Sequence, residues 1–258
     1  MSGAGLTVAV VYPDLLGTYG DGGNGLVLAR RAAWRGVTVD LVEAGSDRPL
    51  PTADLYCLGG GEDLPQARAA ALLAADPTFG RAVGQGSVVL AVCAGFQIVG
   101  RLFPAADGRA LPGLGLLDVA TVKGTGRRAV GEVVAEPWPV GAEGAALPTL
   151  TGFENHAGAT SLGPEASPLA KVVTGVGNGA GDGTEGAWSG RVVGTYLHGP
   201  VLARNPALAD LLLLWALGPG TWLAPLDDAE VAALRAARIG AARHGTPRTR
   251  RWRLPGVR

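Results

Sequence analysis

Short apolar segments that alternate with helical patterns limit the possible fold more than any other feature of the chain. Residues 6–12, 37–43, 54–58 and 87–92 are short segments rich in valine, leucine and alanine, which is typical of strands in a sheet covered by helices. Residues 24–35, 64–75 and 95–103 have helical character. This alternation predicts an α/β fold with a largely parallel sheet that is flanked by helices.

The second half of the chain predicts a different pairing of strands. Residues 121–134 and 172–188 look like hairpin-forming strands with glycine turns, and residues 191–196 look like one more short strand. Helices are expected at 206–217 and 227–244. With no internal repeat in the sequence, we expect one main domain over residues 1–220. A helical extension and a basic tail are expected over residues 221–258.

Composition excludes several classes of function. The 258 residues carry 22 basic and 22 acidic side chains, so nothing suggests a surface for nucleic acid or anionic membrane. No apolar run reaches the ~18–20 residues that span a bilayer, and no secretory signal is apparent. The only cysteines are Cys57 and Cys93. We therefore expect a cytoplasmic chain without a disulfide framework, and we predict no metal site.

Cys93 carries the strongest chemical signal. An apolar strand stops at this cysteine, and Ala94 and Gly95 follow before a helix begins. This is the layout of a nucleophile elbow, in which a sharp turn presents the side chain above the sheet. The helix N-terminus favours the thiolate, and the Ala94 N–H would face a developing oxyanion. The alternative is that Cys93 is an inert cysteine of the core. We interpret Cys57 in this way, because it lies inside a strand pattern and no turn follows it.

A thiolate needs a base, and the chain has three histidines: His156, His198 and His244. His198 follows a short strand that breaks at Gly199 and Pro200, and strand ends commonly present catalytic side chains in α/β sheets. His156 is its rival on spacing alone. His244 lies near the basic tail, where we expect it to be solvated.

Two motifs together resemble a known family. They are Ala91-Val92-Cys93-Ala94-Gly95-Phe96-Gln97 and Tyr196-Leu197-His198-Gly199. The chain is similar in them to the CobB/CobQ-type class I glutamine amidotransferases, which have a flavodoxin-like fold. The resemblance implies that Cys93 is the nucleophile and His198 its base.

Further motifs resemble one branch of that family, the GatD-type glutaminase subunits of lipid II isoglutaminyl synthases. They are Tyr12-Pro13-Asp14-Leu15-Leu16, Thr18-Tyr19-Gly20-Asp21, Gly59-Gly60-Gly61-Glu62-Asp63, Gly152-Phe153-Glu154-Asn155-His156 and the longer Gly194 to Pro200 segment. The resemblance implies hydrolysis of L-glutamine and a heterodimer with a MurT-type, Mur ligase-like synthetase. That partner would use ATP and Mg to amidate the α-carboxyl of D-glutamate in lipid II, at the inner face of the membrane. No cofactor is expected in this chain.

The same resemblance implies further site residues. Arg128 is the substrate-binding arginine by alignment, with Arg127 one register away, and a guanidinium suits the α-carboxylate of glutamine. Gly60 would supply an oxyanion N–H beside that of Ala94. Typical class I domains carry an acid two residues after the histidine, but Pro200 stands there. His198 would then be oriented by a backbone group, by Glu154 or by an acid of the partner.

Three other functions stay open at this stage. One is a related amidotransferase for another carboxylate, such as a corrinoid precursor, although those proteins usually carry a fused ATP-using domain. This chain has no Gly-x-x-x-x-Gly-Lys-Ser/Thr loop. The second is a cysteine hydrolase on a related sheet, which would release no ammonia from glutamine. The third is a non-catalytic binding subunit.

Overall fold

The computed structural model describes residues 5–141 and 144–243. The strands are β1 (Leu6–Val11), β2 (Val39–Ala44), β3 (Leu55–Leu58), β4 (Val88–Val92), β5 (Leu102–Pro104), β6 (Ala110–Pro112), β7 (Val119–Lys123), β8 (Ala129–Pro137), β9 (Leu150–His156), β10 (Gly158–Leu162), β11 (Ser167–Thr174), β12 (Thr184–Ser189) and β13 (Val192–Thr195). The helices are α1 (Gly23–Ala33), α2 (Asp63–Ala75), α3 (Pro77–Gly84), α4 (Ala94–Val99), α5 (Val201–Arg204), α6 (Pro206–Leu217) and α7 (Ala229–Arg243).

A nine-stranded sheet forms the centre of the molecule, in the order β2-β1-β3-β4-β13-β12-β11-β8-β9. The five strands from β2 to β13 are parallel, and the pairs from β13 to β9 are antiparallel. A four-stranded sheet, β10-β7-β5-β6, lies beside it. The predicted α/β class is confirmed, and four of the five parallel strands come from the first half of the chain, with β13 added from the second.

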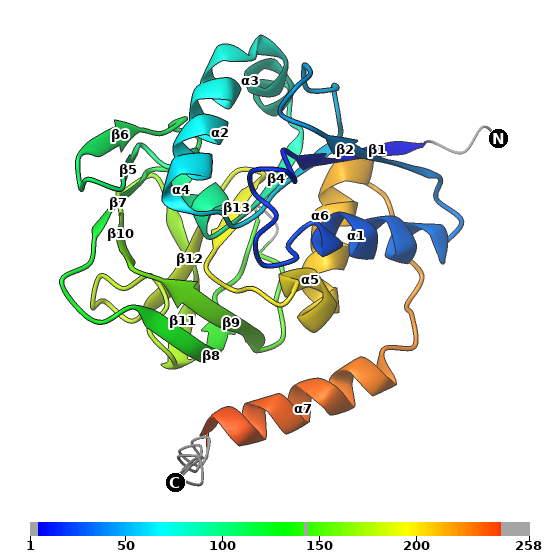
Figure 1. Ribbon diagram of the computed structural model, residues 1–258. Helices are drawn as coiled ribbons and strands as arrows, with labels where there is room; N and C mark the ends of the chain where they lie inside the picture. Colours follow the sequence, from blue (N-terminus) through cyan, green and yellow to red (C-terminus); the bar gives the residue numbers. More distant parts are fainter. Residues whose placement is uncertain (1–4, 142–143, 244–258) are drawn as a thin grey trace, which may run out of the picture.

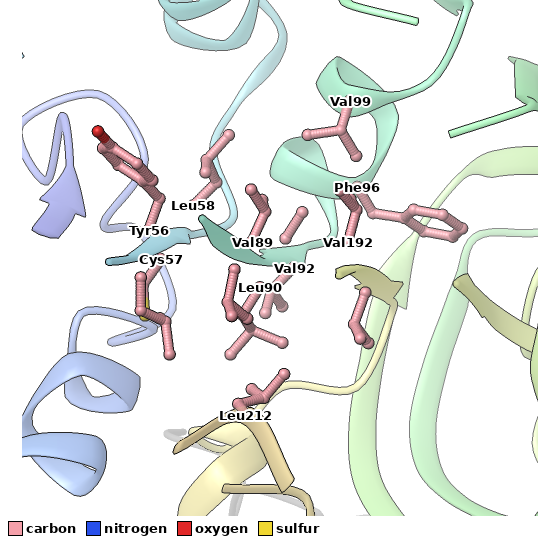
Figure 2. Packing of buried hydrophobic residues seen from close by; sticks show 14 of the residues in the cluster. Tyr56, Cys57, Leu58, Val89, Leu90, Val92, Phe96, Val99, Val192 and Leu212 are labelled. Atoms are coloured by element: carbon pink, nitrogen blue, oxygen red, sulfur yellow. The ribbon is translucent and has the colours of Figure 1, made fainter. Parts of the chain in front are cut away.

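Helices cover both faces of the parallel part, because β3 and β4 are apolar along their whole length and buried on both sides. Figure 2 shows Phe96 and Val99 of α4 on one side of these strands and Leu212 of α6 on the other. In Figure 1, α2, α3 and α4 gather on the first side, and α1, α5 and α6 on the second. Because these strands are parallel, their carboxyl ends all lie at one edge of the sheet.

Several predicted elements differ from the structure. The helix expected over 95–103 ends at Val99, because the extended Gly100 turns the chain into β5. The strands expected over 121–134 belong to two sheets: β7 pairs with β10, whereas β8 pairs with β9 and β11. Strand β9, which carries the Phe153 to His156 motif, was not predicted as a strand. Helix α3 was also missed, although Asp76 caps it by accepting the Thr78 N–H at 2.7 Å.

Helix α7 lies apart from the helical layers in Figure 1, beyond an extended linker, and contacts β8 and β9. An ion pair fixes the end of this linker: the Arg31 guanidinium of α1 pairs with Asp228 of the linker and with Asp210 of α6, at 2.7 Å each. Along α7, Arg238 pairs with Glu132 of β8 at 3.4 Å. A boundary near residue 220 stays a prediction, and His244 with the rest of the basic tail lies outside the described residues.

No helix in the described part of the chain is long and apolar enough to cross a bilayer.

Candidate active site

Cys93 lies at the sharp turn between β4 and α4. Its backbone has φ 53° and ψ −105°, a conformation that side-chain-bearing residues rarely adopt. The turn is held from both neighbouring strands, since the Cys93 N–H donates to Thr195 O at 2.9 Å and the Gly95 N–H to Gly59 O at 3.1 Å. A Cβ on Gly95 would lie 2.7 Å from the Leu58 Cβ, so only glycine fits there. The predicted elbow geometry is present.

Cys57 provides an internal comparison. It lies within β3, and burial raises the pKa of its thiol to about 12. Such a thiol stays protonated and unreactive at neutral pH. The contrast in backbone setting supports the choice of Cys93 over Cys57.

His198 reaches the same edge of the sheet through β13. Strands β4 and β13 are parallel neighbours, with Val92 paired to Thr195, so the residues that follow them lie close together. The His198 backbone is fixed by two hydrogen bonds with Phe153 of β9, of 2.9 and 3.1 Å. Its ring is buried. The structure thus brings together the two residues that the motifs predicted as nucleophile and base.

The ring of His198 is held by Asp21, a residue to which we had assigned no role in the site. The His198 Nδ1 lies 2.9 Å from Asp21 Oδ2 and 3.2 Å from Oδ1. Burial opposes protonation of the imidazole, but the hydrogen bond to Asp21 and the neighbouring Cys93 side chain outweigh it and raise the pKa of His198 to about 10. Among the described residues, the buried Nε2 has no hydrogen-bond partner within ordinary distance.

Glu154, which we had considered for orienting His198, is engaged elsewhere. Its carboxylate accepts the N–H groups of Val176 and Gly177, each at 2.9 Å. Glu154 also lies 3.8 Å from the Nε2 of His156. The prediction that Glu154 orients His198 is therefore wrong.

His156 is part of the wall of the site. Its ring stacks on Tyr196 at 3.8 Å, and its Nδ1 lies 3.0 Å from the carbonyl of Gly158. The carbonyl can only accept, so Nδ1 carries the proton. His156 therefore lines the cavity beside Cys93. His198 instead follows β13, which is the neighbour of the strand β4 that ends at Cys93.

A cavity of about 140 Å³ opens beside Cys93. Its lining residues include Cys93, Ala94, Gly61, Gln66, Gln97, Tyr19, Lys123, Arg128, Asn155 and His156. Arg128 donates from Nε to Asn155 Oδ1 at 2.6 Å and from a terminal nitrogen to Asn155 O at 3.0 Å. Arg127 lines an adjoining cavity that does not include Cys93. The geometry therefore favours Arg128 over Arg127 as the cation for substrate.

The two N–H groups predicted to bind the oxyanion, those of Ala94 and Gly60, lie in different surroundings. Ala94 opens helix α4 and lines the cavity, and none of the described groups accepts its N–H. The Gly60 N–H instead donates to Asp21 Oδ2 at 2.9 Å, and Gly60 does not line the cavity. The oxyanion role predicted for Gly60 does not fit this geometry. Gly61, one residue further along, does line the cavity with its backbone.

Taken together, the cavity is lined by a thiol, a helix N-terminus and a guanidinium, and the imidazole of His198 follows the strand next to the one that ends at the thiol. This set suits a nucleophilic attack on an amide of a substrate with an anionic group at its other end. Among the described residues, no group of three or more His, Cys, Asp or Glu side chains is placed to hold a metal ion.

Comparison with known sequences agrees with this geometry. The model of the CobB/CobQ-like glutamine amidotransferase domain matches residues 7–206. The GatD subunit of lipid II isoglutaminyl synthase (glutamine-hydrolyzing) from Streptococcus pneumoniae is 37% identical over 215 residues, which is 82% of this chain and 80% of that protein. The Staphylococcus aureus subunit of the same name is 36% identical, over 81% of this chain and 83% of that protein.

Cobyric acid synthases are similar over a smaller part of their length. That of Methylorubrum populi is 36% identical over 72% of this chain, but only 36% of that protein is covered. Among solved structures, a glutamine amidotransferase matches with a TM-score of 0.55 and 20% identity, over 82% of this chain and 99% of that one. The PurLQS structure from Thermotoga maritima matches with a TM-score of 0.53 and 18% identity, over 82% of this chain and 94% of that one. These structural matches support the fold alone.

Proposed function

The chain belongs to the CobB/CobQ-like glutamine amidotransferase domain family, and from this membership we propose that it is the glutamine-hydrolysing subunit of a lipid II isoglutaminyl synthase. The observation that supports lipid II as the acceptor is that the similarity extends over most of both chains. This chain and the two GatD subunits match over at least 80% of each other's length. The cobyric acid synthase match leaves most of that protein uncovered, so a corrinoid acceptor has less support.

In the proposed reaction, the thiol proton of Cys93 moves to the Nε2 of His198 and stays there, giving a thiolate–imidazolium pair that the raised pKa of His198 favours. The thiolate attacks the side-chain carbonyl carbon of glutamine, and the N–H groups of Ala94 and Gly61 stabilise the oxyanion. The imidazolium then gives its proton to the amide nitrogen, which leaves as ammonia. A water molecule, deprotonated by His198, hydrolyses the glutamyl thioester and restores the thiol.

Arg128 would pair with the α-carboxylate of glutamine at the far end of the cavity. A guanidinium can form two parallel hydrogen bonds with a carboxylate, which fixes the orientation of the substrate. Because Asn155 already holds this guanidinium from one side, it enters the cavity in a defined direction. Arg128 thus places the amide end of glutamine at Cys93.

The ammonia would be used by a Mur ligase-like, MurT-type partner in a heterodimer. That partner would bind ATP and Mg and amidate the α-carboxyl of D-glutamate in the stem peptide of lipid II. The acceptor would then place the complex at the cytoplasmic face of the membrane. This chain needs no cofactor of its own for amide hydrolysis by a thiolate.

The test is an assay of the assembled complex with lipid II as acceptor. Cys93→Ser should abolish amidation supported by glutamine and leave amidation supported by ammonium chloride, whereas Cys57→Ser should change neither. Arg128→Met should raise the KM for glutamine by roughly 100-fold, about the strength of a charged hydrogen-bonded pair, and Arg127→Met should not. Glutamine-dependent amidation by Cys93→Ser would exclude the proposed role, and activity only on another carboxylate would exclude lipid II.

A further inference from the structure

Asp21 lies in the glycine-rich loop between β1 and α1, 177 residues before the histidine that it contacts. Asp21 is buried, with only 1% of its surface exposed. One carboxylate oxygen, Oδ2, lies 2.9 Å from His198 Nδ1 and accepts the Gly60 N–H at 2.9 Å. An ionised carboxylate can only accept, so the Nδ1 must carry the proton. The other ring nitrogen, Nε2, is then left as the base.

The glycine pair beside Asp21 leaves room for this contact. A Cβ on Gly60 would lie 2.8 Å from His198 Cε1 and 3.2 Å from Asp21 Oδ2. A Cβ on Gly59 would lie 2.1 Å from the carbonyl oxygen of Leu16 and 3.0 Å from the Asp21 Cβ. The absence of side chains at both positions therefore lets the loop, the acid and the imidazole pack against the end of β3.

The same loop also reaches the substrate end of the cavity through Tyr19. The Tyr19 ring is tilted against the His198 ring, with centroids 4.7 Å apart. Its hydroxyl accepts from Asn155 Nδ2 at 3.2 Å and lies 3.5 Å from the Arg128 guanidinium. One loop thus contacts both the imidazole and the groups that face the substrate carboxylate.

We propose that Asp21 is the positioning acid of a Cys93–His198–Asp21 triad, so that the hydrolytic site is complete within this chain. The inference rests on the proposed glutaminase function and adds the identity of the acid. It also removes the need for an acid from the partner. The Nδ1 is already paired inside the chain, and the Nε2 is the nitrogen that must face Cys93. Neither nitrogen is left for a partner residue.

The experiment compares Asp21→Asn with Asp14→Asn. Asp14 belongs to the same loop but is exposed, and its carboxylate accepts from Ser46 instead of His198. In the complex, Asp21→Asn should lower kcat for glutamine hydrolysis by about 100-fold or more, the usual range for lost acid–base catalysis. Asp14→Asn should stay within about twofold of wild type. Amidation supported by ammonium chloride should persist in both, which shows that the variants fold and assemble.

Two further readouts separate positioning from a merely structural role. Removing the carboxylate charge lowers the pKa of His198, so the alkaline limb of the pH–rate profile should move to lower pH in Asp21→Asn and not in Asp14→Asn. In the isolated wild-type chain, a diazo ketone analogue of glutamine should label Cys93 without the partner, and Asp21→Asn should slow that labelling by about 100-fold or more.

Wild-type kcat and an unmoved pH profile in Asp21→Asn would overturn the triad, and so would an equal loss in Asp14→Asn. Labelling of wild-type Cys93 only in the presence of partner would overturn the claim that the site is complete. Failure of the wild-type complex to hydrolyse glutamine is a different result, because it removes the proposed function itself.

Discussion

Replacing Cys93 by glycine should make the protein more stable than replacing it by alanine, which is the reverse of the usual order. Within a strand or helix, glycine is less stable than alanine by roughly 0.5–1 kcal/mol, because it loses more freedom on folding. At Cys93 the backbone has φ 53° and ψ −105°. Holding a Cβ in such a conformation costs on the order of 1–3 kcal/mol, and glycine avoids this cost. Both variants lose the sulfur, so its packing cancels in the comparison.

The net expectation is that Cys93→Gly exceeds Cys93→Ala in free energy of unfolding by about 1 kcal/mol, which is about 2–4 °C in Tm for a chain of this size. Cys57 is the matched control because it is also buried, but it lies in the regular strand β3. There, Cys57→Gly should be less stable than Cys57→Ala by about 1 kcal/mol. Equilibrium unfolding in urea, with equal slopes for all four variants, measures both differences.

If the glycine variant were less stable than the alanine variant at both positions, backbone strain at Cys93 would be refuted. If the predicted reversal is found, the elbow is a place where stability is given up to present a thiol. The turn keeps its shape because the Cys93 N–H is bound to β13 and the Gly95 N–H to the end of β3. The neighbouring strands thus hold the nucleophile in a conformation that its own sequence does not favour.

Two further predictions concern the buried surroundings of the site. Burial raises the pKa of Glu185 to about 7, so the folded state binds more protons than the unfolded state between pH 4.5 and 7, and stability falls as pH rises through this window. Between pH 5 and 8, Glu185→Gln should therefore lose less free energy of unfolding than wild type, by on the order of 3 kcal/mol. Urea unfolding at several pH values measures this, and the same dependence of stability on pH in both proteins would contradict it. Gly194→Ala should destabilise the protein by at least about 1–3 kcal/mol, because its Cβ would lie 2.0 Å from Phe96 Cδ2. Gly131→Ala, where no atom lies within 4 Å, is the control, and equal losses of Tm in the two variants would argue against the clash.

The parallel half of the fold was predictable because each of its strands is a short apolar segment with a clear end. The antiparallel half was less so, since β9 carries Glu154, Asn155 and His156 and does not resemble a strand by composition. Its pairing with β8 joins two successive strands, but the contact of Phe153 with His198 depends on a partner far away in sequence. Composition alone holds no information about such partners.

Within the site, Cys93 and His198 were predicted as a pair because each follows a strand and belongs to a motif, and the structure has their strands side by side. Gly60 was misinterpreted for a physical reason. A glycine at a strand end allows a close approach, but the sequence does not say what approaches. We expected the substrate, and the structure has the Asp21 carboxylate and the His198 ring there.

The position of Pro200 explains why the acid lies so far from the histidine. Pro200 leads into α5, and the Leu202 N–H donates to Asn24 Oδ1 at 3.0 Å. The Asn24 N–H in turn donates to the carbonyl of Asp21 at 2.9 Å. The segment after the histidine therefore packs against the start of α1 and holds the loop that supplies the acid. A carboxylate at position 200 would lose the proline that leads into this helix. The segment after His198 thus helps to hold an acid that comes from near the other end of the chain.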